Sequence, residues 1–406
     1  MKLAREGSSA MTSERRLSIS NLISRFRSKK RTTDASRMSK TATSNLSRDS
    51  RPPLATSPLP FVLPEHQHTL STLGWTTLSF PSSARQDAPT NDTAITAPPG
   101  PHLPTTFPLQ QAYEQLLSAS QAFFAQADGE KQRWKHTLRS EEGWSKIPGE
   151  KEFITLRTLD YCPELLRQPA KRYWDLMGAH LSTTLGRIST TLHLPDEESG
   201  GLRKFVGPCG SMQAADARKT ATMLRLFRYE TWEAKEVAEP HADLGLLSVV
   251  VGDVPGLEVW DGRAWFACEK ERGESGQHGA TMLAGRQLER LSNGRYPAGG
   301  HRVVSYGLPT PKTDVSSSVE EKHYRFSIVF VLRAHEPVMI NSSDLETEIT
   351  GTWSEPMHGI DAGTLYAQIR GRHFNINIDP EEREKQRQKV RKEKVDKQAG
   401  SGHIVA

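Results

Sequence analysis

The stretch Arg325-Phe326-Ser327-Ile328-Val329-Phe330-Val331-Leu332 decides how the second half of this chain folds. Successive side chains of an extended strand project to opposite faces, so two sets of four residues form here. One set is Phe326, Ile328, Phe330 and Leu332, and the other is Arg325, Ser327, Val329 and Val331. Both faces are apolar except at Arg325 and Ser327. The pattern predicts a strand that is covered on both sides.

Further β-rich runs surround this strand and are separated by clusters of Gly, Pro, Asn and Asp, which favours a barrel or jelly roll. They are Leu244–Val251, Leu257–Phe266, His301–Tyr306 and Tyr324–Leu332. In the first half, apolar residues recur at helical spacing from Leu109 to about Trp134 and from Trp174 to Ile188. We therefore predict an α+β protein with a double-stranded β-helix (jelly roll) core and packing helices from the N-terminal half.

Four regions are expected along the chain. Residues 1–60 read as a disordered basic and Pro-rich tail, 61–215 as a helical region, 216–345 as the jelly-roll domain, and 346–406 as a C-terminal helix with a charged tail. Met1–Arg51 carries 13 Lys and Arg against 4 Asp and Glu, and it is Ser/Thr-rich and nearly free of aromatic residues. Such a segment buries too little apolar surface to offset its ordering entropy.

Charge and composition limit the partners and the compartment. The remaining residues carry 40 basic against 44 acidic side chains, so we expect no nucleic-acid partner beyond the basic tail. No apolar run reaches the roughly 18 residues that span a bilayer, which predicts no membrane partner. Three widely spaced cysteines favour a reducing compartment. We expect a cytoplasmic protein, with the nucleus as an alternative because of the cluster Arg27–Arg31; a mitochondrial transit peptide is disfavoured by Glu6 and Glu14.

A candidate metal site lies at His241-Ala242-Asp243. Residues i and i+2 of extended backbone project to one face, so an imidazole and a carboxylate can converge there. His301 opens another β-rich run and supplies a third candidate ligand. Two histidines and one carboxylate on one face of a metal ion leave positions open, which is typical of non-haem Fe(II) oxygenases.

Arg325 and Ser327 form a candidate anion site on the strand quoted above. A guanidinium in so apolar a strand is costly unless it meets an anion, and arginine grips carboxylates in a bidentate manner. Ser327 lies on the same side and can donate a further hydrogen bond. The pattern indicates a dicarboxylate clamp; the alternative is an internal salt bridge to Asp or Glu.

The chain resembles the 2-oxoglutarate/Fe(II)-dependent dioxygenases of the isopenicillin-N-synthase-like branch. Five sequence motifs match this family in order and spacing over about 100 residues. They are Leu224–Tyr229, His241-Ala242-Asp243, Gly256–Trp265, Leu291–Tyr296 leading to His301-Arg302-Val303, and Arg325-Phe326-Ser327. The resemblance implies that His241, Asp243 and His301 are catalytic residues that bind Fe(II). It further implies that Arg325, Ser327 and Tyr229 bind the cosubstrate 2-oxoglutarate.

The activity that the resemblance implies is the hydroxylation or desaturation of a small organic molecule with O2, releasing succinate and CO2, with ascorbate in support. Phe227 departs from the family pattern, where an Asn is common, and this weakens the role of Tyr229. Cys268–Ala280 and Leu308–Glu321 are polar insertions relative to the family. Two alternatives stay open: an Fe(II) oxidase on the same scaffold that does not consume 2-oxoglutarate, and a non-catalytic binding module that retains the fold.

Overall fold

The computed structural model describes residues 49–80, 107–135, 141–231, 233–270, 279–307, 324–373, 375–378 and 380–401. Most of the predicted tail 1–60 and the whole insertion Leu308–Glu321 lie outside these residues, as does most of the insertion Cys268–Ala280. The predictions made for them stay predictions.

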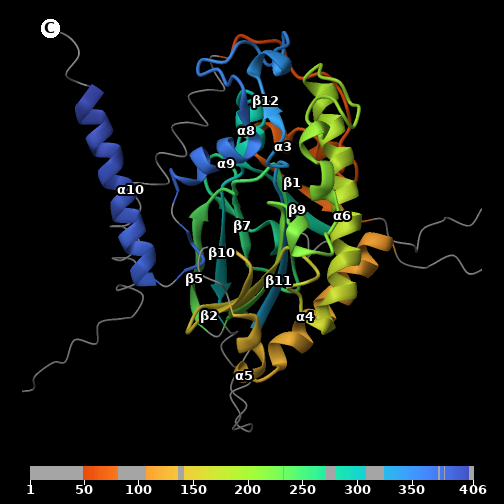
Figure 1. The fold of residues 1–406 in the computed structure, drawn as a ribbon, viewed down its shortest axis with the longest axis vertical. Coiled ribbons are helices and arrows are strands. Elements are labelled where there is room, and N and C mark those ends of the chain that lie inside the picture. The colour runs from red at the N-terminus through yellow and green to blue at the C-terminus, as the bar shows by residue number, and fades with distance from the viewer. Residues whose placement is uncertain are drawn as a thin grey trace, which may run out of the picture. The chain divides into compact units, whose positions relative to one another are not determined.

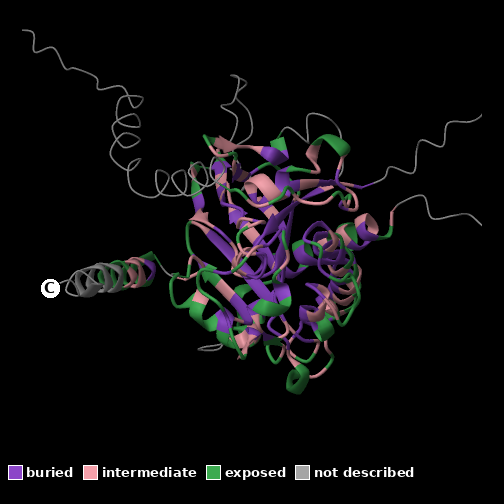
Figure 2. Ribbon diagram, turned by 90° about the horizontal axis from the view of Figure 1, so that it is seen from above, coloured by how far each residue is buried: buried purple, intermediate pink, exposed green. Residues whose placement is uncertain are grey.

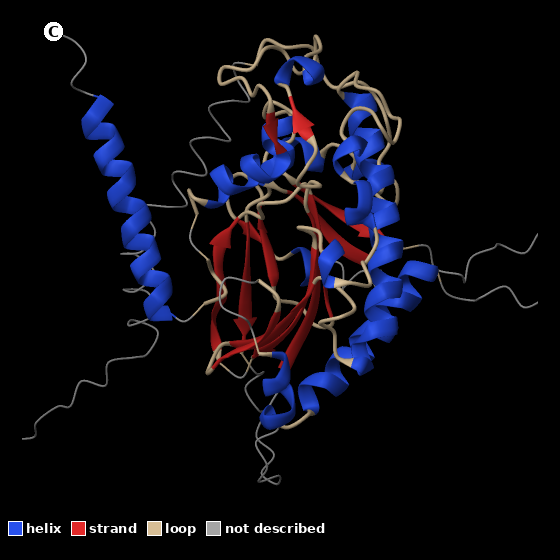
Figure 3. Cartoon of the chain, in the orientation of Figure 1, coloured by secondary structure: helices blue, strands red, loops and turns tan. Residues whose placement is uncertain are grey.

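Most strands belong to two antiparallel sheets (Figure 3). The seven-stranded sheet has the order β1-β9-β6-β11-β4-β3-β2, and the four-stranded sheet has the order β5-β10-β7-β8. The first sheet comprises β1 (Trp75–Ser79), β2 (Gly143–Ile147), β3 (Lys151–Leu156), β4 (Met223–Glu230), β6 (Leu247–Gly252), β9 (Gly279–Ala284) and β11 (Tyr324–Leu332). The second comprises β5 (Ala234–His241), β7 (Leu257–Trp260), β8 (Trp265–Phe266) and β10 (His301–Tyr306). A two-stranded sheet pairs β12 (Met339–Ile340) with β13 (Ile360–Asp361).

Helices complete the fold (Figure 1). They are α3 (Thr69–Leu73), α4 (Pro108–Ala125), α5 (Asp128–Lys131), α6 (Glu164–Thr191), α8 (Arg286–Leu291), α9 (Ala362–Arg370) and α10 (Pro380–Ser401), with short 3-10 turns between them. Helices α4 and α6 lie side by side, joined by hydrogen bonds from Arg172 to Gln111 and Gln115. No helix among the described residues is both long and apolar enough to cross a membrane.

The alternation predicted for β11 is observed, and it separates two buried cores. Phe326, Ile328, Phe330 and Leu332 pack in the core shared with α4 and α6, whereas Val329 packs in the core between the two sheets. Strand β4 repeats this division: Leu224 and Leu226 face the helices, and Phe227 and Tyr229 face the other sheet. Figure 2 shows that buried residues gather on the strands and on the helix faces that cover them. The layers are therefore helices, large sheet, inner core and small sheet.

The sequence predicted strands His301–Tyr306 and Tyr324–Leu332 with the observed bounds. The predicted helix Leu109–Trp134 ends earlier, at Ala125, and is followed by short helical turns. Strand β1 begins at Trp75, because Gly74 adopts a left-handed conformation that ends α3 there. Mixed helices and antiparallel sheets are confirmed. Because β1, β2 and β3 join the large sheet, residues 61–215 are not only helical.

Candidate metal centre

Two neighbouring strands of the small sheet bring His241 and His301 together. His241 is the last residue of β5, His301 is the first residue of β10, and the two are direct antiparallel partners. Their ring centroids lie 4.1 Å apart. Side chains of directly opposed residues project to the same face of a sheet. The small sheet therefore presents both imidazoles at one point.

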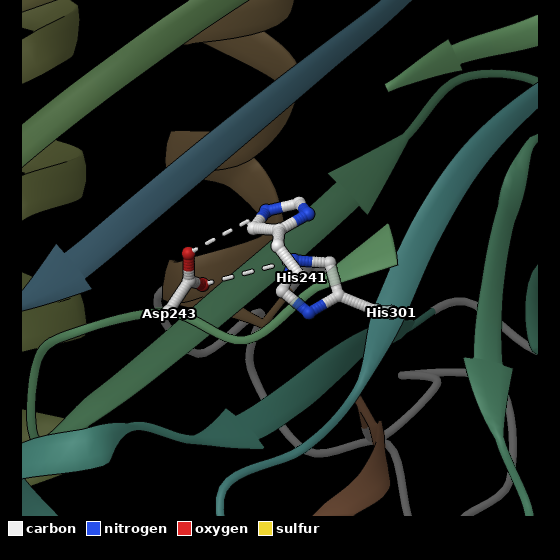
Figure 4. Close-up of side chains that lie close together, drawn as sticks. All are labelled: His241, Asp243 and His301. Carbon is white, nitrogen blue, oxygen red and sulfur yellow. Dashed lines mark ion pairs between the residues drawn. The ribbon is translucent and has the colours of Figure 1, made fainter. Parts of the chain in front are cut away.

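Asp243 follows β5 by two residues and completes a group of three (Figure 4). Its Oδ1 lies 3.9 Å from Nε2 of His241, and its Oδ2 lies 3.9 Å from Nε2 of His301. One candidate ligand atom from each residue lies within 4.8 Å of the other two. The structure thus brings the three residues proposed as ligands into one group that could hold a metal ion.

Backbone carbonyls fix the orientation of both imidazoles. Nδ1 of His241 donates to the carbonyl of Glu239 at 2.7 Å, and Nδ1 of His301 donates to the carbonyl of Gly299 at 3.1 Å. A carbonyl only accepts, so the neutral ring carries its proton on Nδ1 and its lone pair on Nε2. Burial and the adjacent His301 lower the pKa of His241 to about 3. His241 is therefore neutral near pH 7, as a metal ligand must be.

Asp243 offers one carboxylate oxygen that lacks a hydrogen-bond donor among the described residues. Its Oδ2 is buried and accepts no hydrogen bond within the described part of the chain. Burial acts to raise its pKa, but the two imidazoles outweigh this effect and hold the pKa below its ordinary value. A buried carboxylate normally has a partner. The donor set therefore fits a divalent cation such as Fe(II).

Arg325 and Ser327 lie on the same face of β11 as Val329, which packs in the inner core, and both are about 1% exposed. Arg325 is already paired: its Nη2 lies 2.9 Å from Oε2 of Glu269. The structure thus contains the internal salt bridge that the sequence left as an alternative. Even so, Nη1 of Arg325 and Oγ of Ser327 are buried and form no hydrogen bond among the described residues. These two donors lie on one face of β11 and can both donate to a carboxylate oxygen. The binding of 2-oxoglutarate by Arg325 and Ser327 stays a prediction.

Tyr229 lies opposite Arg325 in the pairing of β4 with β11. The guanidinium carbon of Arg325 lies 5.5 Å from the centroid of the Tyr229 ring. Burial raises the pKa of Tyr229 to about 12, although the charge of Arg325 and the nearby hydroxyl of Ser327 act in the opposite direction. The phenol therefore keeps its proton and can donate to a bound anion. Phe227 stacks on Tyr229 at 5.1 Å, which holds the ring in place despite the departure from the family pattern.

The sequence did not reveal three further charged residues in this region. Glu269, in the polar insertion, is the partner of Arg325. Lys151 on β3 is opposite Tyr229, and burial lowers its pKa to about 7. Arg225 on β4 donates from Nε to Thr155 and acts on Asp243 through its charge. Strand alternation puts Arg225 on the same face as Phe227 and Tyr229, and this signal could have indicated that Arg225 lies near the site. No local sequence signal pairs Glu269 with Arg325.

His180 and His335 do not belong to the group that could hold a metal ion. His180 is buried in α6, where burial lowers its pKa to about 4. His335 lies beyond β11, and its backbone N–H donates to the carbonyl of Phe205. Trp260 and Trp265 contact each other across β7 and β8. His278 and His323 lie outside the described residues.

Comparisons with known proteins place this arrangement among solved folds. A scan against protein-family models found no match. A search of curated protein sequences found no similar protein. A full-length protein from Neurospora crassa, solved in complex with alpha-KG, is similar in structure: the TM-score is 0.51 at 17% identity, over 75% of this chain and 88% of that one. The complex of the same Neurospora crassa protein with alpha-KG and thymine has a TM-score of 0.50 at 17% identity, over 75% and 89% of the two chains.

A structure of JOX2 in complex with 2OG, Fe and JA is also similar, with a TM-score of 0.48 and 17% identity, over 64% of this chain and 74% of that one. At this level of identity the similarities to the Neurospora crassa protein bear on the fold. The chain therefore shares its fold with a Neurospora crassa protein that was solved with alpha-KG bound.

Proposed function

We propose that this protein is an Fe(II)- and 2-oxoglutarate-dependent oxygenase that hydroxylates or desaturates a small organic molecule and releases succinate and CO2. The two facing antiparallel sheets are, in this proposal, the two halves of a double-stranded β-helix. His241, Asp243 and His301 hold the iron at its open end. The observation that carries the proposal is the pair of imidazoles whose Nδ1 atoms donate to carbonyls and whose Nε2 lone pairs turn to one carboxylate.

Bound iron and 2-oxoglutarate supply the activation of O2 and the oxidation of a substrate C–H bond. The chain contributes positioning and exclusion of water. The inner core that adjoins the metal centre is apolar and aromatic, with Phe227 and Tyr229 from one sheet and Val259 and Val303 from the other. Such surroundings keep water from the reacting groups.

Arg225 supports a small polar or anionic substrate. Its guanidinium carbon lies 5.5 Å from the ring centroid of Phe153 and 6.0 Å from that of Phe227. The charge of Arg225 also acts on Asp243, and a guanidinium near the metal centre can bind an anionic group of a substrate. The Neurospora crassa complex that holds thymine gives an example of a small, flat molecule on this fold.

The test is succinate release from 2-oxoglutarate, measured with Fe(II), ascorbate and fractions of a metabolite extract. Substrate-stimulated succinate that is absent in Asp243→Ala supports the proposal. A protein that binds Fe(II) and consumes O2 without succinate would instead be the oxidase. That second candidate is favoured by one observation, the pairing of Arg325 with Glu269. A protein that loses Fe(II) on mild chelation and shows no turnover would instead be the non-catalytic binding module.

A further inference from the structure

Glu269 occupies one edge of the guanidinium that was predicted to bind 2-oxoglutarate. Nη2 of Arg325 donates to Oε1 at 3.0 Å and to Oε2 at 2.9 Å of Glu269. Nε of Arg325 donates to the carbonyl of Val254 at 3.0 Å. This Nε/Nη2 edge, which commonly receives a carboxylate, is therefore filled by acceptors of the chain itself.

Glu269 is fixed by further contacts and does not simply reach across a surface. Its Oε2 accepts the backbone N–H groups of Gly256 at 2.9 Å and Leu257 at 2.8 Å. Glu269 is 6% exposed and Arg325 is 1% exposed. The negative charge of Glu269 raises the pKa of Arg325 against the effect of burial. The two charges form a buried, hydrogen-bonded and neutral pair.

Two glycines leave the space that this pair fills. A Cβ at Gly252 would overlap Nη2 of Arg325 and lie 2.8 Å from Oε1 of Glu269. A Cβ at Gly256 would lie 2.6 Å from Nε of Arg325. Contacts this short require atoms to move. The absence of side chains at both positions thus accommodates the ion pair in its observed place.

An anion that reaches Arg325 meets only part of the guanidinium. Nη1 of Arg325 and Oγ of Ser327 are the buried donors there that lack partners within the described residues. Glu269 neutralises the positive charge with which Arg325 would attract an anion. The negative charge of Glu269 also repels a second carboxylate placed beside it.

We propose that Glu269 is a built-in counter-ion that competes with the distal carboxylate of 2-oxoglutarate for Arg325 and thereby weakens cosubstrate binding. The inference rests on the proposed function and adds to it. It makes Glu269 a residue that sets the 2-oxoglutarate concentration at which the protein works. Removing its charge leaves Arg325 without a counter-ion, and the cosubstrate then takes that place.

The direct test is the Kd of 2-oxoglutarate, measured by calorimetry on the full chain loaded with Mn(II). We expect Glu269→Gln to bind 2-oxoglutarate at least tenfold more tightly than the wild type. Glu258→Gln is the matched control, because Glu258 accepts from Nε of Arg302 at 2.7 Å in the small sheet; its Kd should be unchanged. Equal or weaker binding by Glu269→Gln overturns the proposal, since weaker binding would mean that Glu269 positions Arg325 for the ligand.

A second measurement needs no variant. The wild-type protein is titrated with 2-oxoglutarate and with 2-oxobutyrate, which keeps the chelating keto acid and lacks the distal carboxylate. Because Glu269 already neutralises Arg325, we expect the two Kd values to differ by less than tenfold. A preference of several hundredfold for 2-oxoglutarate overturns the inference. If the Mn(II)-loaded wild type binds neither keto acid, the proposed function itself fails, which is a distinct outcome.

Discussion

His241 and His301 are direct partners across two antiparallel strands, although 60 positions separate them in the chain. Each ring donates its Nδ1 proton to a carbonyl two residues earlier in its own segment, Glu239 for the first and Gly299 for the second. The same local arrangement thus occurs twice and turns both Nε2 atoms toward Asp243. Such support of ligand orientation contributes to metal affinity.

Replacing His241 by Ala is expected to abolish metal binding and activity while the fold is kept, because the sheets pack through apolar cores that do not include the imidazole. Metal content after dialysis and the circular dichroism spectrum are the measurements. His193→Ala is a control, since His193 is exposed and pairs with Glu348. A folded His241→Ala protein that keeps one metal ion per chain would contradict the assignment, as would collapse of its spectrum.

Replacing Arg325 by Met or Ala is expected to destabilise the protein and to raise the apparent KM for 2-oxoglutarate. The substitution leaves Glu269 buried without its counter-ion, and breaking a buried pair in this way costs about 3–5 kcal/mol. Urea unfolding measures the loss. The double variant Arg325→Met with Glu269→Gln should recover much of it, because neither charge then remains. An unchanged KM would argue against any role of Arg325 in cosubstrate binding.

Replacing Gly252 by Ala is expected to destabilise the protein by about 1–3 kcal/mol, in the range of overpacking substitutions. The added Cβ would lie against both Arg325 and Glu269. Gly129→Ala is the control, since nothing lies within 4 Å of a Cβ built there. Equal unfolding midpoints for the two variants would show that the ion pair shifts without cost.

Replacing Lys151 by Met is expected to stabilise the protein most at low pH. The pKa of Lys151 is about 7 in the folded protein, below its ordinary value of 10.5, because burial disfavours the charged amine. Between these two pKa values the unfolded chain binds more protons than the folded protein does. The free energy of unfolding of the wild type therefore rises with pH in this range. The loss of stability caused by the buried charge of Lys151 is fully present below pH 7 and disappears toward pH 10.

Denaturant unfolding at pH 6 and pH 9 measures this difference for Lys151. Lys146→Met is the control, because Lys146 is partly exposed and its pairing with Asp128 raises its pKa. A stability gain for Lys151→Met that is the same at both pH values would show that Lys151 is charged, or neutral, throughout the range.

Part of the fold was predictable because it follows from local pattern. The alternation in Tyr324–Leu332 predicted a strand covered on both sides, and its two faces do lie in two different cores. Short elements were harder: the turn at Gly74 and the division of Leu257–Phe266 into β7 and β8 depend on backbone conformation and on partners in other strands.

The sequence by itself determined the candidate metal ligands, since His241, Asp243 and His301 belong to recognisable sequence motifs near the ends of predicted strands. It also determined that Arg325 requires an anion, because a guanidinium in an apolar strand cannot remain unpaired. Which anion is present in the folded chain was decided by tertiary structure alone. Glu269 lies 56 positions away in a polar insertion, and its carboxylate reaches Arg325 while also accepting the backbone N–H groups at the start of β7. Long-range ion pairs depend on where the backbone places two charges, and local periodicity carries no record of that placement.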